Sequence, residues 1–484
     1  MGLVKKTGLG LLVLLAVPLV AILVLQAVID PNDYKETIRQ IAAKQNIDLM
    51  MKGDIHWSFF PAPAFTVEEI DAVLLTGGDR LPLHIATLKI ALAIAPLLSR
   101  NIEFHSVEIK GASAKNLNDI DLLIEDLNSS GRSFPVTLSL VFVQDAAVQL
   151  PIQLKAEANV NLADKQAARI ALDPLDITID NSSIAGSIQW QQGSPDHIAL
   201  NLHSDQLIAR NVKLTNVQMS AVMDGKKITL QSFDANAYHG KIHSSGSIDI
   251  TNSKTAPLRL DTEIKDMQLA SFLADLQQKP AKILAGNLQL DSRLTAMPLS
   301  QAGMLKTLSG DLKFSVDGLV IDEMNLEKRV CEAAAKLDGK ALTAKQWPEK
   351  TGLRETRGVV RIQNGIMMMT PLVAKLDTLD LNGIGPVSLL DDTMDLRLDL
   401  TAIDNQKAVN ACEIMNPRLT EISWPLRCRG NFATQSGKEL CNIDQSRLDK
   451  LVFQAAEQKL GEKLKEKMGK DGEKLNEALK KLFH

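Results

Sequence analysis

The sequence predicts a mainly β protein: an elongated antiparallel β groove with an N-terminal transmembrane helix and C-terminal amphipathic helices. Three observations support this fold class. A charge-free apolar run lies near the N-terminus, apolar residues recur at every second position through most of the chain, and helical periodicity returns after residue 444. Because 484 residues are too many for one ordinary compact core, we expect several domains or one extended repetitive body.

The first element is the run GLGLLVLLAVPLVAILVLQAVI, residues 8–29, which contains no charged side chain. As a helix rising about 1.5 Å per residue it would span roughly 33 Å, which matches a bilayer core. A cleavable signal peptide is the alternative, but its apolar region is usually ~7 to 15 residues long. Lys5 and Lys6 precede the run, so the positive-inside rule makes residues 1–7 a cytoplasmic tail. We expect an uncleaved single-pass anchor in the cell inner membrane, with the body in the periplasm if the host is Gram-negative.

A short helix should follow the anchor and end near Lys44. The Asp30 carboxylate can cap its free amides, and Pro31 suits its first position. The next stretch, GDIHWSFFPAPAF (Gly53–Phe65), gathers several of the chain's few aromatic residues beside prolines that interrupt strand pairing. Two interpretations stay open. The stretch is either the aromatic base of a groove close to the membrane or a hydrophobic plug that closes the N-terminal end of the core.

Beyond residue 47 the apolar period is two, which indicates strands with one apolar and one polar side. The clearest rows are Ile55, Trp57 and Phe59; Val136, Leu138, Leu140 and Phe142; Ile152, Leu154, Ala156, Ala158, Val160 and Leu162; Leu258, Leu260, Thr262 and Ile264; Leu312, Phe314 and Val316; and Leu396, Leu398 and Leu400. Turn signals between such rows favour antiparallel hairpins over helical crossovers. They include Asp224-Gly225, Asp317-Gly318, Asn364-Gly365 and the two glycines of Gly383-Ile384-Gly385.

Helical interruptions are expected near residues 94–98, 270–278, 299–308 and 325–337. We divide the body into an N-terminal piece (30–133), middle β repeats (134–299), a C-terminal β domain (300–443) and a helical tail (444–484). In the tail, an apolar stripe runs from Leu448 to Met468 among lysines and glutamates. This pattern favours a solvated amphipathic helix that docks by its stripe, and anchoring at a membrane surface is the alternative.

The four cysteines, Cys331, Cys412, Cys428 and Cys441, all lie in the last third of the chain. An even number in an oxidising compartment favours two disulfides, although four cysteines allow three connectivities. We predict Cys428 with Cys441, which closes a short loop, and Cys331 with Cys412. A zinc site is disfavoured because no C-x-x-C pair or histidine cluster accompanies them.

Motifs that carry enzymatic chemistry are missing from the sequence. The eight histidines form no H-E-x-x-H pair, and there is no G-x-S-x-G elbow, phosphate-binding loop or dinucleotide fingerprint. We therefore predict that the protein is not an enzyme and uses no metal or cofactor. A net charge of -4, with no basic stretch that carries aromatics, argues against nucleic acid as a partner.

The remaining feature is a large amount of one-sided apolar strand surface. Such a sheet must pack against another sheet, close into a barrel or face apolar ligands. The rows consist of Leu, Ile, Val, Ala and Met with few aromatics, so they could line a groove wide enough for acyl chains. Composition alone does not separate that groove from a closed sandwich.

The sequence resembles the AsmA family of Gram-negative inner-membrane proteins. The resemblance rests on the anchor followed by IDPNDYKETI, on GDIHWSFFPAPAFTVEEIDAVLL, and on C-terminal stretches that include RGVVRIQNGIMMMTPLVAKLDTLDLNGIGPVSLLDDTMDLRLDL and WPLRCRGNFATQSGKELCNID. It implies an elongated β groove with a chorein-like N-terminal piece, related to TamB and to bridge-like lipid carriers, and phospholipid as the bound partner. The candidate groove residues are Trp57, Phe59, Phe60, Phe65, Leu138, Leu140, Phe142, Leu154, Leu260, Ile264, Phe314, Met367, Met369, Leu396 and Leu398.

Two functions follow from these expectations. The first is handling or conduction of phospholipid by an inner-membrane-anchored periplasmic protein, in support of outer-membrane lipid homeostasis and envelope integrity. The second is a scaffold that assists outer-membrane protein assembly, with outer-membrane or periplasmic proteins bound along an exposed strand edge. An enzyme acting on envelope glycans ranks third.

Overall fold

The computed structural model describes most of the chain between residues 30 and 454. The described ranges are 30–44, 47–58, 62–76, 79–93, 103–127, 133–145, 148–161, 168–179, 182–193, 195–209, 211–252, 257–275, 283–297, 301–339, 347–403, 422–435 and 437–454. Within these ranges the fold is mainly β, with 23 strands that pair antiparallel. The chain divides into two compact units, residues 1–207 and 208–484.

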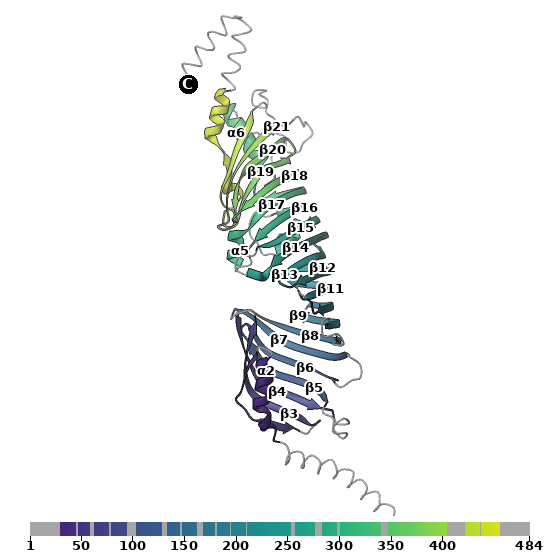
Figure 1. Ribbon diagram of the computed structural model, residues 1–484. Coiled ribbons are helices and arrows are strands. Elements are labelled where there is room, and N and C mark those ends of the chain that lie inside the picture. Colours follow the sequence, from purple (N-terminus) through teal and green to yellow (C-terminus); the bar gives the residue numbers. More distant parts are fainter. Residues whose placement is uncertain are drawn as a thin grey trace, which may run out of the picture. The chain divides into compact units, whose positions relative to one another are not determined.

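The first unit begins with helix and continues as strands (Figure 1). Its elements are η1 (Pro31–Tyr34), α2 (Lys35–Lys44), β1 (Ile47–Met51), β2 (Ile55–Ser58), β3 (Ala64–Thr76), β4 (Asp79–Leu92), β5 (Phe104–Ala114), β6 (Leu117–Ile124), β7 (Ser133–Asp145), β8 (Val148–Asn161), β9 (Arg169–Ile179), β10 (Ser182–Gln191) and β11 (His197–Ala209), the last of which reaches the boundary of the unit. Both β1 and β2 pair with β3, and each strand from β3 to β10 pairs with the next in sequence. The unit is therefore a meander of hairpins, as predicted.

The helix start is also as predicted. The side chain of Asp30 accepts a hydrogen bond from the Asn32 amide at 2.9 Å, and Pro31 occupies the first position of η1. The amide of Ile55 donates to the Asn32 side chain at 2.9 Å, and Lys35 forms an ion pair with Asp54 at 2.8 Å. These contacts fasten the start of the helix to the beginning of β2.

The second unit has the same meander, and in its described part four α-helices and one short 3-10 helix are inserted between the strands. Its elements are β12 (Val212–Asp224), β13 (Lys227–Ala237), β14 (Gly240–Asp249), η2 (Ile250–Asn252), β15 (Leu258–Gln268), α4 (Leu269–Asp275), β16 (Ile283–Ala296), α5 (Gln301–Thr307), β17 (Ser309–Asp322), α6 (Leu326–Leu337), β18 (Lys350–Gln363), β19 (Ile366–Lys375), β20 (Leu379–Ser388), β21 (Thr393–Ala402), β22 (Ser423–Asn431), α8 (Gly437–Leu440) and β23 (Cys441–Ile443). Residues 445–454 form a further helix. Three predicted helices thus correspond to α4, α5 and α6.

Several predictions fall on residues that the structure does not describe. These are the anchor (8–29), the helix at 94–98, the tail beyond residue 454, and the side chains of Phe59, Phe60 and Cys412. Within the described ranges, none of the helices combines the length and hydropathy needed to span a bilayer.

Bulges interrupt the regular alternation of many strands. An extra residue stands in β5, β6, β12, β15 and β18, where the ladder register shifts by one position. Each bulge holds a residue with positive φ: Gly111, Asp119, Asn216, Asp266 and Glu355. Because a bulge bends its strand and increases the local twist, the repeated bulges curve the sheet in each unit.

Two of the turn assignments were wrong. Asp317-Gly318 lies inside β17, and Gly383-Ile384-Gly385 lies inside β20. Gly318 has φ +62°, which permits an irregular strand position, and nothing lies within 4 Å of the place where a Cβ would stand. At Gly383 a Cβ would lie 2.7 Å from the Leu398 side chain, so that glycine makes room for its neighbour. These glycines serve close approach or unusual φ within strands rather than chain reversal.

Candidate functional site: the apolar face of the sheet

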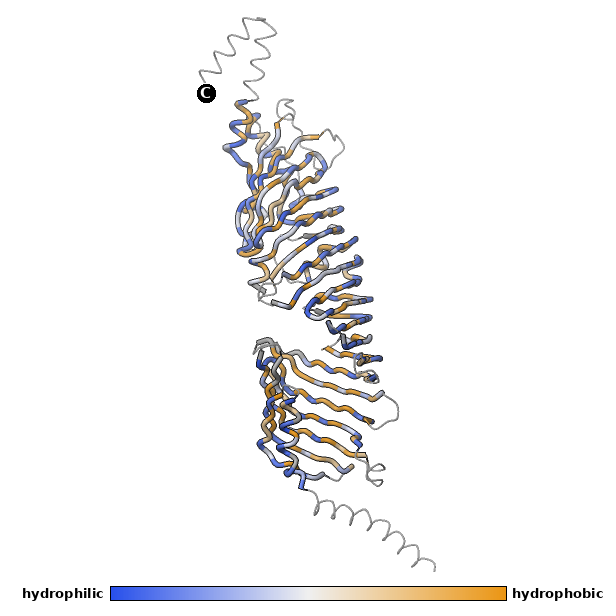
Figure 2. The backbone as a smooth tube through the Cα atoms, in the orientation of Figure 1, coloured by the Kyte–Doolittle hydropathy of each residue, from blue (hydrophilic) through white to orange (hydrophobic). Residues whose placement is uncertain are grey.

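In the first unit, apolar residues of neighbouring strands line up in rows that cross the sheet. One row takes a single residue from each strand from β2 to β10: Ile55, Val67, Leu88, Ile109, Leu122, Leu138, Leu154, Ile177 and Ile184. A second row lies two residues along each strand: Trp57, Phe65, Ile90, Val107, Ile124, Val136, Ala156 and Leu175. We call these rows the apolar face of the first unit. Figure 2 shows the alternation of apolar and polar residues along these strands.

The apolar face of the first unit is buried at its β2–β3 end, where Ile55 and Val67 are 4 % and 6 % exposed, and it is less buried along β8. The main contacts of each strand are with its ladder neighbours, and α2 contacts β1. Along β8 the polar side chains are exposed, whereas Ile152, Leu154 and Val160 are only half-buried. Apolar rows packed under a second sheet would be fully buried, as they are in a sandwich. Within the described residues this face is therefore open along β8.

The opposite face of the same strands is polar. The ladder places Thr137, Lys155 and Asp176 in one row across β7, β8 and β9, and the side chains of all three are exposed. The sheet of the first unit thus has one side suited to water and one side suited to apolar ligands.

Two aromatic residues mark the beginning of this face. Trp57 of β2 and Phe65 of β3 are ladder partners, and their ring centroids are 4.2 Å apart with planes tilted by 40°. Beside them, Ile55, Val67, Ile70, Ile85 and Ala112 form a small buried cluster. The described part of the aromatic stretch is therefore gathered at one end of the rows, which is compatible with both interpretations of this segment.

The second unit carries a corresponding apolar face. One row runs from β13 to β22 through Ala235, Ile242, Ile264, Leu290, Phe314, Gly358, Leu372, Gly383, Leu398 and Leu426. Where this row reaches β18, the ring of Phe314 lies over Gly358, so that a Cβ there would be 2.6 Å from the ring. The glycines of the row therefore accommodate the large side chains beside them.

A line of hydroxyl groups runs through the same face. Ser244, Thr262 and Ser292 are ladder neighbours on β14, β15 and β16. The hydroxyls of Ser244 and Thr262 are 3.0 Å apart, and Ser292 donates to the Thr262 carbonyl. These groups satisfy one another, so they cost little in an apolar setting.

The far end of this face is closed by helices. A core of fully buried side chains lies between β18 to β22, α6 and residues 445–454, and it includes Val330, Leu400, Trp424, Leu426 and Leu448. Along β18, alternate side chains from Leu353 to Ile362 are buried, in contrast to the half-buried row of β8. The second unit therefore has a second layer over its last strands.

Helix α6 is held over this core by polar contacts at its N-terminus. The Asn325 side chain accepts from the Lys328 amide at 2.7 Å as an N-cap. The Glu327 carboxylate is 5 % exposed and accepts from the Thr378 amide at 2.8 Å and from its hydroxyl at 2.7 Å. Burial raises the pKa of Glu327, and the two Thr378 hydrogen bonds oppose this rise.

The comparison with protein families identifies the chain. A family profile described as the AsmA family matches residues 3–185 and 151–372, which is more than half of the sequence. The chain belongs to the AsmA family. Searches of curated proteins and of solved structures found no match.

In this AsmA-family chain, the described groove candidates lie on the two apolar faces. Trp57, Phe65, Leu138 and Leu154 belong to the rows of the first unit, and Leu140 and Phe142 lie two and four residues beyond Leu138 on β7. In the second unit, Leu260, Ile264 and Phe314 are half-buried, as are Met367, Met369 and Leu396. Leu398 is 5 % exposed and belongs to the closed core. Lipid contact by any of these side chains stays a prediction.

The predicted disulfide Cys428–Cys441 is confirmed. The two cysteines are ladder partners on β22 and β23, with an S–S distance of 2.01 Å. Cys331 of α6 is also disulfide-bonded, and Cys412, its predicted partner, lies outside the described residues.

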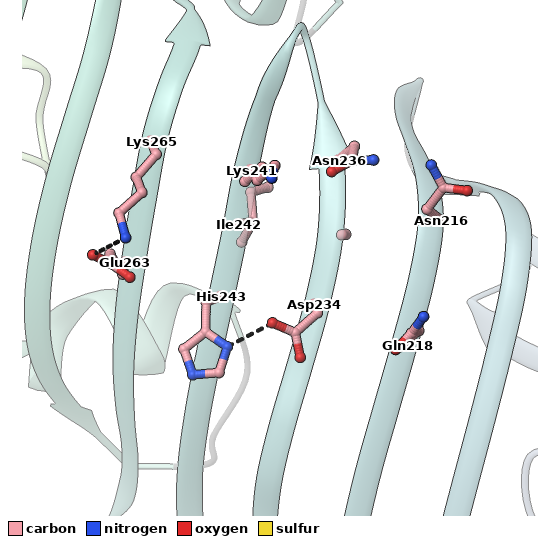
Figure 3. Close-up of a pocket in the computed structure, with 10 residues that line it drawn as sticks. Asn216, Gln218, Asp234, Asn236, Lys241, Ile242, His243, Glu263 and Lys265 are labelled. Carbon is pink, nitrogen blue, oxygen red and sulfur yellow. Dashed lines mark hydrogen bonds and ion pairs between the residues drawn. The ribbon is translucent and has the colours of Figure 1, made fainter.

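Titratable groups on the polar face were not singled out from the sequence. The His243 Nδ1 atom lies 2.7 Å from the Asp234 carboxylate, and Lys265 pairs with Glu263 at 2.7 Å. Both pairs lie beside a pocket on β12 to β15 (Figure 3). His84 lies 2.8 Å from Asp71, and hydrogen bonds from Lys52 and His84 lower the pKa of Asp71. In the described ranges, no group of three or more His, Cys, Asp or Glu side chains has an arrangement that could hold a metal ion.

Proposed function

We propose that this AsmA-family protein handles phospholipid on the apolar face of its sheet, without catalysis. The observation that carries the proposal is the combination of continuous apolar rows and incomplete burial in the first unit. Leu154 and its ladder neighbours are half-buried, and no second layer of described residues covers them. Soluble proteins rarely leave large apolar surfaces without a partner, and such surfaces often mark ligand-binding grooves. Acyl chains suit this face because it consists of aliphatic side chains and offers few hydrogen-bonding groups.

The proposed setting is the inner membrane, with the apolar run at residues 8–29 as a single-pass anchor and the body in the periplasm. The confirmed disulfide supports this placement, because structural disulfides persist in oxidising compartments and are rare in the cytosol. Lipid bound there would be available for outer-membrane lipid homeostasis, as the family resemblance implies.

The assembly-scaffold hypothesis requires a free strand edge that can pair with a client polypeptide. The last described strand, β23, has three residues and pairs with Leu426, Arg427 and Cys428 of β22. So short an edge offers few ladder positions to a client. The wide apolar face therefore favours lipid over polypeptide.

The test is photocrosslinking from matched positions on the two faces. A photoreactive amino acid at Leu154 reports on the apolar face, and the same amino acid at the adjacent Lys155 reports on the polar face. We expect phospholipid, identified by mass spectrometry, to be captured from position 154 and not from position 155. If no lipid is crosslinked from either position, the proposal is overturned. Capture of polypeptides alone would favour the scaffold hypothesis.

A further inference from the structure

A pocket lies on the second unit where the β13–β14 hairpin ends. Its volume is about 680 Å³, within the range of small-molecule sites. The lining groups come from the ends of three strands, the hairpin turn and the end of α4: Lys213, Thr215, Asn236, Tyr238, His239, Lys241 and Asp275. Figure 3 shows two of them, Asn236 and Lys241, side by side on neighbouring strands. A hairpin end is where the two faces of a sheet meet, so the pocket lies at the border of the apolar face.

The charges around this pocket favour an anion. Among the described residues, neither Lys213 nor Lys241 has a carboxylate partner, whereas the neighbouring Lys265 is neutralised by Glu263 at 2.7 Å. The single carboxylate of the lining, Asp275, accepts a hydrogen bond from the Tyr238 hydroxyl at 2.8 Å. With two lysines and one aspartate, the lining carries an excess of positive charge. The Asn236 side-chain amide adds a neutral hydrogen-bond donor, while the Thr215 hydroxyl donates to the Asn236 backbone carbonyl at 3.5 Å.

The turn that forms the wall of the pocket has an unusual backbone. Tyr238 and His239 have φ of 48° and 67°, a left-handed conformation that side chains with a Cβ disfavour. Contacts with α4 keep Tyr238 in this conformation: its ring meets Phe272 edge-on at 5.7 Å, and its hydroxyl donates to Asp275. Burial, followed by the Asp275 hydrogen bond, raises the pKa of Tyr238, so the phenol stays protonated as the donor. Positive φ at both central residues is the geometry that a two-residue hairpin turn requires.

We propose that this pocket binds the phosphate of a phospholipid headgroup, with Lys213 and Lys241 as its charged ligands. This inference rests on the proposed function, because it places the headgroup at the border of the face that would hold the acyl chains. Ala235 and Ile242 belong to the apolar row and lie three residues from the turn on the opposite side of the same strands. An amphiphile at the hairpin end can therefore keep its phosphate at the lysines and its chains on the apolar face.

The test compares two photoactivatable lipids with identical acyl chains, phosphatidic acid and diacylglycerol, on the full chain in detergent. We expect the wild type to capture more phosphatidic acid than diacylglycerol. The variant K213Q/K241Q should lose this preference, with phosphatidic acid capture reduced about tenfold, because each lost charge contact at an exposed site weakens binding several-fold. The matched control is K226Q/K227Q, which removes two exposed lysines at the opposite end of the β12–β13 hairpin.

A second arm uses inorganic phosphate. The lysine amines are acylated chemically, with and without inorganic phosphate at about 10 mM, and the modified sites are identified by mass spectrometry. This experiment reports whether phosphate protects Lys213 and Lys241 from acylation. Equal capture of both lipids by wild type and variant would overturn the headgroup site and leave the proposed function standing. Protection by free phosphate without any lipid preference would assign the pocket to a soluble phosphate and overturn the lipid assignment. Failure to capture either lipid would remove the proposed function itself, and with it this inference.

Discussion

The openness of the apolar face predicts that one substitution has very different costs at two leucines. Leu154 is half-buried on β8 of the first unit, whereas Leu400 is 0 % exposed in the closed core of the second. Replacement of Leu400 by Asn should cost roughly 4–6 kcal/mol of unfolding free energy, because a cavity penalty of ~2–4 kcal/mol adds to the burial of an amide. At Leu154 the amide can reach water. The cost should be only about 1 kcal/mol, roughly half the value of a fully buried leucine.

The assay is denaturant unfolding of the full chain in detergent, monitored by limited proteolysis. The proteolytic fragments report the unfolding of each unit separately. The variant K155N controls for the lower strand propensity of Asn, since Lys155 is exposed on the same strand. A destabilisation of L154N that approaches that of L400N would refute the reasoning, because it would mean that another layer covers Leu154.

Three further predictions concern the closed end of the second unit. Reduction of the Cys428–Cys441 disulfide, or replacement of both cysteines by serine, should lower the unfolding free energy by about 2–3 kcal/mol. Denaturant unfolding measures this loss, and thiol alkylation checks that reduction is complete. An unchanged unfolding midpoint would contradict the prediction. Because the pKa of Glu327 is raised, the folded state binds its proton more tightly, and wild-type stability should fall as the pH rises above the ordinary glutamate pKa and then level off. E327Q keeps an acceptor for Thr378 and should remove this slope, and an identical slope in E327Q would refute the assignment. E327A should also lack the slope and should cost about 1–3 kcal/mol at acidic pH, with a smaller cost as the pH rises, because the Thr378 donors lose their acceptor. G358A should lower the unfolding free energy by about 1–3 kcal/mol, because the new Cβ would meet the Phe314 ring. In a double-mutant cycle, F314L should reduce this loss, and strictly additive effects of the two substitutions would exclude the contact.

The sequence predicted the strands well where the alternation is uninterrupted. In β8, the residues Ile152 to Val160 keep one phase over the whole strand, and the structure follows it. In β15 the row Leu258 to Ile264 is continued by Met267, three residues later, because the bulge at Asp266 shifts the phase. A charged residue with positive φ inside a strand leaves no period-two signal, so Met267 could not be assigned to the apolar face.

The distinction between a groove and a closed sandwich was also beyond the sequence. Leu154 and Leu400 both stand in alternating rows, and the pattern is the same whether a second layer is present or not. The decision depends on distant segments, namely α6 and residues 445–454, which cover β18 to β22. Helix α6 was predicted, but its place over the sheet follows from tertiary contacts such as Glu327 with Thr378, which lie 51 residues apart.

The difference between the two ends of the second unit restricts how a lipid would use it. From β13 to β16 the apolar face has half-buried rows, and from β18 to β22 the same rows enter the closed core. A chain lying on the open part meets side chains such as Leu398 and Leu426 that are already packed against helices. The N-cap of α6, the Glu327 hydrogen bonds and the Cys331 disulfide all resist displacement of that helix. If the proposed function holds, a lipid on this unit would therefore be confined to the strands before β18, and it would have to leave the face there rather than continue beneath α6.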